Sequence, residues 1–131
     1  MQSHVLLIDD DEDDQFIFLK AINETAPGYL CWVSNNGPDG LFALTSDSCK
    51  PEMIFLDLNM PLMNGFEFLM LLKNDAKFSN IPVIIFSTSN NPADKKRAED
   101  LGALKFITKT GDIQLLKRDL NRIFNSDSLT N

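Results

Sequence analysis

Short apolar runs alternate with amphipathic stretches along most of the chain. The apolar runs predict buried strands, as expected when both faces of a sheet are covered, at residues 5–8, 29–34, 53–58, 81–86 and 104–107. The amphipathic stretches predict helices at residues 15–23, 38–45, 66–73, 92–101 and 113–124. The last helix has the clearest periodicity, because Ile113, Leu116 and Leu120 fall on one stripe with Ile123 and Phe124. Strands that alternate with helices predict parallel βαβ units, and therefore an α/β fold with an open sheet between two layers of helices.

The chain has the length and composition of a single globular domain. Its 131 residues are 44% hydrophobic and 24% charged, which excludes disordered and collagen-like classes. No repeat or linker interrupts the pattern. We expect one domain over residues 1–125 and a short polar tail at 126–131, with no output domain.

Charge and cysteine usage limit the partners and the compartment. The chain has 12 Lys+Arg and 19 Asp+Glu, a net charge of −7, which argues against nucleic acid or an anionic membrane because phosphate contacts need a basic face. No apolar run approaches the roughly 18 residues of a membrane span, and no secretory signal is visible. Cys31 and Cys49 fit reduced thiols better than a disulfide framework or a zinc site. We therefore expect a cytoplasmic protein.

Polar residues end four of the five predicted strands. Asp9 and Asp10 end the first strand, Asp57 the third and Ser87 the fourth, and the fifth runs into Lys109. Function in doubly wound sheets collects at the carboxyl ends of the strands. We therefore expect these side chains to meet at one rim.

Carboxylates crowded at one rim favour a hard divalent cation, which relieves their repulsion. Oxygen ligands without a thiolate or imidazole suit Mg²⁺ or Mn²⁺. Beside such a cation, Asp57 can attack phosphorus and form an acyl phosphate. Lys109 would then neutralise negative charge on the phosphoryl oxygens, and Ser87 would donate a hydrogen bond to them.

Simpler structural roles stay open for the same residues. Asp57 can begin a turn before Pro61, and Ser87 can satisfy local backbone groups. The acids at 12–14 favour the positive end of a helix, and an Asp before Gln15 can cap that helix.

Taken together, the chain resembles the response-regulator receiver domain of bacterial two-component signalling. The matching segments are VLLIDDDEDD (5–14), MIFLDLNMPLMNG (53–65), IPVIIFSTS (81–89) and GALKFITK (102–109). Each is weak alone, but their order and spacing are highly specific. The resemblance covers all but the C-terminal tail and implies a flavodoxin-like (βα)5 fold with strand order 2-1-3-4-5.

The resemblance also implies roles at the rim. Asp57 is similar to the phospho-acceptor, and Lys109 to the amine that pairs with the phosphoryl group. Asp9 and Asp10 are similar to the metal acids, joined by Asp57 and the backbone carbonyl of Asn59. The implied cofactor is Mg²⁺, with Mn²⁺ as a possible substitute.

Two further residues resemble the family's switch. Ser87 is similar to the hydroxyl that moves toward the phosphoryl group, and Phe106 to the aromatic residue that rotates with it. The resemblance implies a monomeric or weakly dimeric switch rather than an enzyme. Its implied partners are a sensor histidine kinase or histidine phosphotransfer protein and a separate downstream effector.

One position departs from the family pattern. The family usually has Pro after the Lys, often with a cis bond before it, whereas Thr110 follows Lys109 here. A non-proline cis bond costs about 2.5–4 kcal/mol. We expect either a cis Lys109–Thr110 bond or a trans loop, and a trans loop is able to displace the amine and weaken phosphorylation.

Three rival functions remain at this stage. A phosphohydrolase of the haloacid-dehalogenase type usually needs a second Asp where Asn59 stands. A flavodoxin-like FMN carrier needs a phosphate loop after the first strand, where acids stand instead. A pseudo-receiver would keep the fold and signal without phosphate, and Thr110 gives that alternative weight.

Overall fold

The computed structural model describes residues 3–125, so the expected tail at 126–131 lies outside the described residues. Five strands alternate with five helices along the chain. The strands are β1 (Ser3–Ile8), β2 (Tyr29–Ser34), β3 (Met53–Leu56), β4 (Val83–Ser87) and β5 (Lys105–Thr108). The helices are α1 (Glu12–Thr25), α2 (Gly37–Leu44), α3 (Gly65–Lys73), α4 (Pro92–Asp100) and α5 (Ile113–Phe124). The predicted α/β alternation is confirmed.

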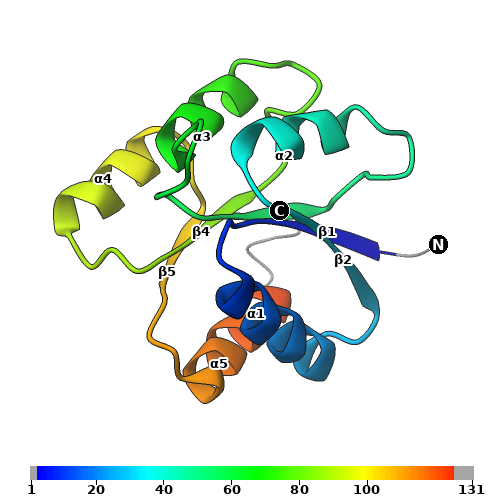
Figure 1. Cartoon of the computed structure of the whole chain (residues 1–131), viewed down its shortest axis with the longest axis vertical. Coiled ribbons are helices and arrows are strands. Elements are labelled where there is room, and N and C mark those ends of the chain that lie inside the picture. The colour runs from blue at the N-terminus through cyan, green and yellow to red at the C-terminus, as the bar shows by residue number, and fades with distance from the viewer. Residues whose placement is uncertain (1–2, 126–131) are drawn as a thin grey trace.

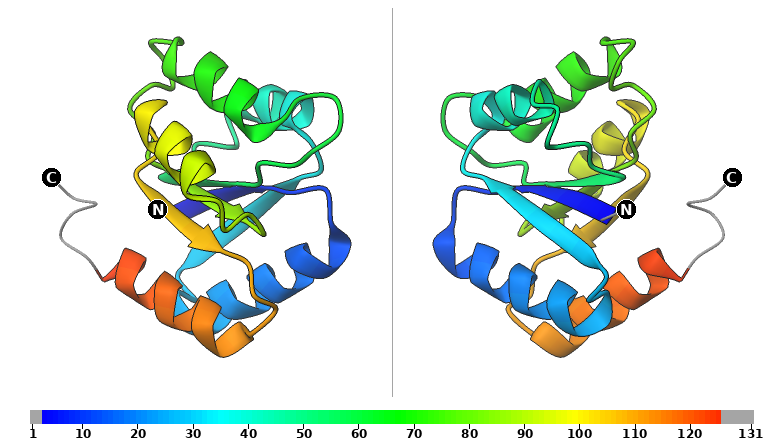
Figure 2. Two further views of the ribbon diagram at one scale, coloured as in Figure 1. Left: turned by 90° about the vertical axis from the view of Figure 1, so that its left-hand side faces the viewer. Right: turned by 90° about the vertical axis from the view of Figure 1, so that its right-hand side faces the viewer.

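All neighbouring strands are parallel, in the order β2-β1-β3-β4-β5. Helices α1 and α5 lie on one face of the sheet, and α2, α3 and α4 lie on the other (Figure 1). Figure 2 shows the molecule from its left-hand and right-hand sides, with the sheet as the middle of three layers. This is the flavodoxin-like arrangement, and its strand order reverses beside β1.

The core consists of two apolar clusters, one on each side of the sheet. In β1, Val5 and Leu7 face α1 and α5, whereas Leu6 and Ile8 face α2 and α3. All four side chains are fully buried. Because both faces of the strand are covered, the sequence reads as an uninterrupted apolar run rather than an alternating one.

Side-chain caps fix where the helices begin. Asp11 caps α1 by accepting a hydrogen bond from Asp14 N at 3.0 Å, so the helix begins at Glu12 rather than at the predicted residue 15. Just after the end of α4, Gly102 has a φ of 105°, which glycine adopts without steric cost.

The described residues contain neither a membrane-spanning helix nor a disulfide. Within residues 3–125, no helix is long and apolar enough to cross a bilayer. Cys31 and Cys49 are both free thiols.

Candidate functional site

The carboxyl ends of β1 and β3 bring three carboxylates together. Oxygens of Asp9, Asp10 and Asp57 lie within 4.8 Å of one another. Asp9 and Asp57 are buried, whereas Asp10 is exposed. The two buried acids lie on adjacent strands because β1 pairs with β3. The rim expected from the strand ends is therefore present in the fold.

Asp9 is fixed by backbone hydrogen bonds and by the Lys109 ammonium. Its backbone N donates to Ser34 O at 3.0 Å, and its Oδ1 accepts from Asp11 N at 3.0 Å. Oδ2 is buried without a hydrogen bond among the described residues, although Lys109 Nζ lies 2.8 Å away as an ion pair. Burial raises the pKa of the Asp9 carboxyl, against the lowering effect of Lys109.

Asp57 extends β3 by one residue into the same space. Its backbone N donates to Ile8 O at 3.0 Å, and its Oδ1 accepts from Leu58 N at 2.9 Å. Burial raises the pKa of Asp57 to about 6; the Lys109 charge opposes this rise and the Asp9 charge adds to it. Asp57 Oδ2 faces Lys109 Nζ at 3.6 Å, which is an ion pair without a hydrogen bond.

Lys109 reaches the carboxylates from the end of β5. Its backbone N donates to Ser87 O at 2.7 Å, which extends the pairing of β5 with β4. Its side chain is only 6% exposed, and its Nζ lies 2.8 Å from both Asp9 Oδ2 and Asp14 Oδ2. Burial disfavours the ammonium, but the contacts with Asp14 and Asp9 outweigh it and raise the pKa of Lys109.

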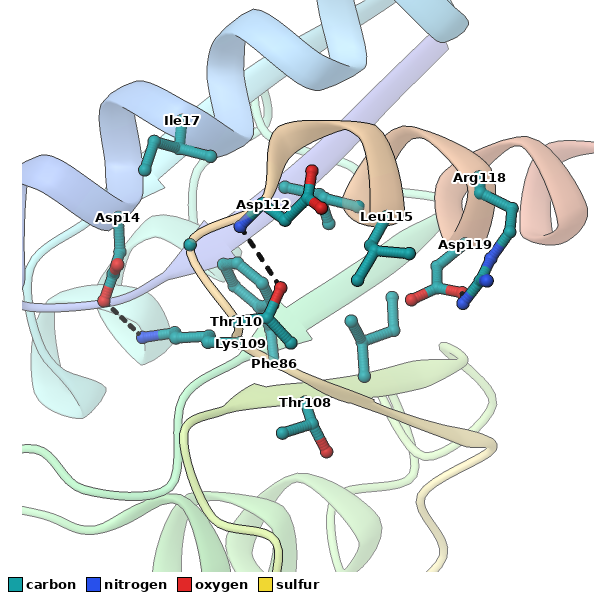
Figure 3. A pocket seen from close by; sticks show the side chains of 13 residues that line it. Asp14, Ile17, Phe86, Thr108, Lys109, Thr110, Asp112, Leu115, Arg118 and Asp119 are labelled. Carbon is teal, nitrogen blue, oxygen red and sulfur yellow. Dashed lines mark hydrogen bonds and ion pairs between the residues drawn. The ribbon is translucent and has the colours of Figure 1, made fainter.

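The loop after Lys109 takes the trans alternative. Every peptide bond of the described residues is trans, including Lys109–Thr110. Thr110 Oγ1 accepts from Asp112 N at 3.2 Å at the start of α5 (Figure 3). The displacement of the amine that a trans loop allows does not occur, since Lys109 lies among the acids.

Three other predicted residues lie near this site without joining the carboxylates. Ser87 is fully buried, and its Oγ accepts from Ser89 N at 3.2 Å rather than bonding to Asp57 or Lys109. Phe106 is half-buried against the cluster on the α3 and α4 side of the sheet. Asn59 is exposed, and its backbone N–H helps to lower the pKa of Asp57.

The residues present fit a divalent cation. All the available ligand atoms are oxygens, a set that favours Mg²⁺ or Mn²⁺ over zinc. Among the described residues, the buried Asp9 Oδ2 has the Lys109 ammonium as its ion-pair partner and accepts no other hydrogen bond, so it remains able to bind an ion. The acidic triad is therefore suitable for a divalent metal.

Asp14 is the site residue that the sequence pattern did not identify. It was interpreted as a helix-end acid, and its position in the first turn of α1 agrees with that. The structure adds a hydrogen bond from Lys109 Nζ, across 95 positions of sequence. Local spacing gives no signal for such a contact, because it depends on how α1 packs against α5 and the sheet.

The loop that follows β3 is closed by Gly65. Gly65 N donates to Leu58 O at 2.9 Å. A Cβ at Gly65 would lie against Asp57 O and 2.8 Å from Leu58 Cα. Only glycine fits at this position without a shift of the backbone around Asp57.

Comparison with known proteins gives the family. Residues 5–121 match the response regulator receiver domain. Because this match spans most of the chain, the protein belongs to the receiver-domain family, whose members are generally phospho-accepting switches rather than enzymes. Membership in this family rules out the haloacid-dehalogenase and flavodoxin alternatives.

Individual relatives agree with that assignment. Protein PilH of Pseudomonas aeruginosa is 33% identical over 118 residues, which cover 90% of this chain and 95% of PilH. The two-component response regulator ORR3 of rice is 30% identical over 122 residues, covering 93% of this chain and 91% of ORR3. The crystal structure of the phosphorylated cyanobacterial phytochrome response regulator RcpA has a TM-score of 0.85 at 26% identity, covering 94% of this chain and 91% of RcpA.

Proposed function

We propose that this protein is a single-domain response regulator that accepts a phosphoryl group on Asp57. One observation carries the proposal: Asp57 is buried beside Asp9 and Asp10 and faces the Lys109 ammonium at 3.6 Å. Phosphoryl transfer to a carboxylate requires that nucleophile, further carboxylates that bind a cation, and an amine in a fixed position. RcpA is phosphorylated in its crystal structure, and ORR3 is a two-component response regulator, which supports the same chemistry here.

The phosphoryl donor is a phosphohistidine on a sensor histidine kinase or a histidine phosphotransfer protein. A carboxylate oxygen of Asp57 forms a bond to phosphorus as the phosphorus–nitrogen bond of the donor breaks, and the imidazole nitrogen takes that electron pair. Lys109 then donates hydrogen bonds to the phosphoryl oxygens. Asp9, Asp10, Asp57 and the Asn59 carbonyl would hold Mg²⁺ or Mn²⁺, which when bound supplies positive charge for the phosphoryl oxygens.

The output is a change in protein–protein contacts. Phosphorylation adds roughly two negative charges in a site that is already acidic. Ser87 turns its hydroxyl toward the new group and Phe106 follows, which shifts a two-state equilibrium of the surface formed by α4, β5 and α5. The receiver domain spans residues 1–125 and passes its signal to a separate effector in the cytoplasm, as a monomer or weak dimer. It is not an enzyme beyond its own phosphotransfer and slow dephosphorylation.

The test is an intact-mass measurement after incubation with acetyl phosphate or phosphoramidate and Mg²⁺. We expect a gain of about 80 Da, one added phosphoryl group, in the wild type. Asp57→Asn should gain nothing, because it lacks the attacking carboxylate. Asp13→Asn is the matched control, since Asp13 is exposed and its carboxylate has no hydrogen bond or ion pair within residues 3–125. Equal labelling of the wild type and Asp57→Asn would refute the site, and no labelling of the wild type would favour the pseudo-receiver alternative.

A further inference from the structure

The Lys109 ammonium is held by helix α1 as well as by the acids of the rim. Its Nζ donates a hydrogen bond to Asp14 Oδ2 at 2.8 Å, drawn as a dashed line in Figure 3. Asp57 Oδ2, at 3.6 Å, is more distant. The side chain of Asp14 is 28% exposed, whereas that of Lys109 is 6% exposed. A partly solvated carboxylate thus holds a buried ammonium that faces the acceptor.

The loop after Lys109 does not hold the amine by itself. Its peptide bonds are trans, and its side-chain hydrogen bonds, from Asp112 N to Thr110 Oγ1 and from Gln114 N to Asp112 Oδ1, lie beyond the lysine. A cavity of about 190 Å³ also borders Lys109, with Asp14, Ile17 and Leu115 in its lining (Figure 3). The long lysine side chain therefore has space to move, and its position depends on what its ammonium contacts.

The other close contact of the ammonium competes with a cation. Asp9 Oδ2 lies 2.8 Å from Lys109 Nζ, and it is the oxygen to which no backbone group donates, since Asp11 N donates to Oδ1. An ion held by the acids would take up that oxygen. Asp14 is outside the group of Asp9, Asp10 and Asp57 that could hold the ion. Of the carboxylate contacts of Lys109, the one with Asp14 can therefore persist when a cation is bound.

Helix α1 gives Asp14 a fixed position. Asp14 N donates to Asp11 Oδ1 at 3.0 Å in the first turn. Further along the helix, Phe18, Ala21 and Ile22 are buried in the core. A side chain on a packed helix is a more precise anchor than one on a loop.

We propose that Asp14 is a positioning residue for Lys109, holding its ammonium where the phosphoryl oxygens of Asp57 will lie. It acts through Lys109 and contacts neither the donor nor the cation. Asp14 thereby restrains the Lys109 side chain from helix α1, whereas a proline after Lys109 would restrain it from the loop. The inference rests on the proposed phosphorylation of Asp57.

The kinetic test compares Asp14→Ala with Asp13→Ala. Both variants remove one carboxylate from the first turn of α1, so both reduce the repulsion of an anionic donor, but only the first removes the anchor. Phosphorylation by phosphoramidate is followed by intact mass over a range of Mg²⁺ concentrations. We expect the maximal rate to fall roughly tenfold or more in Asp14→Ala, because misplacing a reacting group by about 1 Å can cost 100-fold. The Mg²⁺ concentration for half-maximal rate should stay the same, and Asp13→Ala should match the wild type.

A second measurement needs neither cation nor phosphate. In the metal-free protein, the ¹⁵N–¹H signal of the Lys109 ammonium, assigned by its loss in Lys109→Arg, should shift and weaken in Asp14→Ala but not in Asp13→Ala. Should Asp14→Ala fail to fold, Asp14→Asn keeps an oxygen acceptor and should give an intermediate rate and signal. Rates and signals equal to wild type, or equal effects of both alanine variants, would overturn the proposal. If the wild type takes no label, the proposed function fails, and the metal-free signal alone decides whether Asp14 anchors Lys109.

Discussion

Gly65 lies where the loop after β3 returns to the backbone of Asp57 and Leu58. Any Cβ at Gly65 would press on Asp57 O and Leu58 Cα, which are backbone atoms and cannot rotate away. We expect Gly65→Ala to lower the free energy of unfolding by about 1–3 kcal/mol, the usual cost of overpacking. Urea unfolding followed by circular dichroism measures it. Gly28→Ala is the control, because a Cβ there meets no atom within 4 Å; equal losses in the two variants would contradict the steric explanation.

The location of some site residues could be predicted from the sequence, and that of others could not. Asp9, Asp57 and Lys109 were placed at one rim because each lies at or near the end of a buried apolar run, and strand ends share an edge in a parallel sheet. Asp14 was not, because its contact with Lys109 depends on the packing of α1 rather than on local spacing. The trans bond before Thr110 also lay beyond the sequence pattern, which left two alternatives open.

At the scale of elements, the alternation of apolar runs and amphipathic stretches predicted every strand and helix, whereas side-chain hydrogen bonds set the ends. The strand β3 ends at Leu56, two residues before the predicted end. The chain bends at Leu58, whose N donates to Asp57 Oδ1 instead of continuing the sheet. The strand order came from the family resemblance, since periodicity carries no information on which strands are neighbours.

The start of α3 depends on a reciprocal cap. Asn64 Oδ1 accepts from Glu67 N at 2.9 Å, and Glu67 Oε1 accepts from Asn64 N at 3.0 Å. Removing the cap with Asn64→Ala should lower the free energy of unfolding by about 1 kcal/mol. Asn23→Ala is the control: Asn23 is exposed within α1, and alanine is the better helix former there. Thermal unfolding of both variants provides the comparison, and an Asn64→Ala protein as stable as the control would show that the cap contributes nothing.

At the scale of the whole molecule, the apolar core and the charged site occupy separate parts of the same strands. The two apolar clusters cover the sheet's faces, and the polar residues begin where β1, β3 and β5 end. The site therefore concentrates negative charge without placing it inside the core. Three neighbouring carboxylates with one ammonium leave an excess of negative charge in the absence of a cation. Such a site should lower the free energy of unfolding of the metal-free protein.

The pH dependence of stability follows from Asp57. Burial raises its pKa to about 6 in the folded protein, against about 3.9 in an unfolded chain. The folded state thus holds the proton more tightly, so this stabilising contribution is complete below about pH 4 and is lost as the pH rises through 6. In EDTA at pH 7, we expect Asp57→Asn to exceed the wild type in free energy of unfolding by up to about 3 kcal/mol. The difference should shrink toward zero near pH 4.

The matched variant Asp13→Asn removes the same charge from an exposed position and should leave the free energy of unfolding nearly unchanged. Mg²⁺ should reverse the order at pH 7, because a ligand that binds only the folded state stabilises it, and the wild type keeps all three carboxylates. Urea unfolding at pH 4 and 7, with EDTA or Mg²⁺, measures all three proteins. A metal-free Asp57→Asn protein less stable at pH 7 than Asp13→Asn would contradict this prediction. It would mean that Lys109 fully compensates the Asp57 charge, so that the carboxylate does not destabilise the metal-free protein.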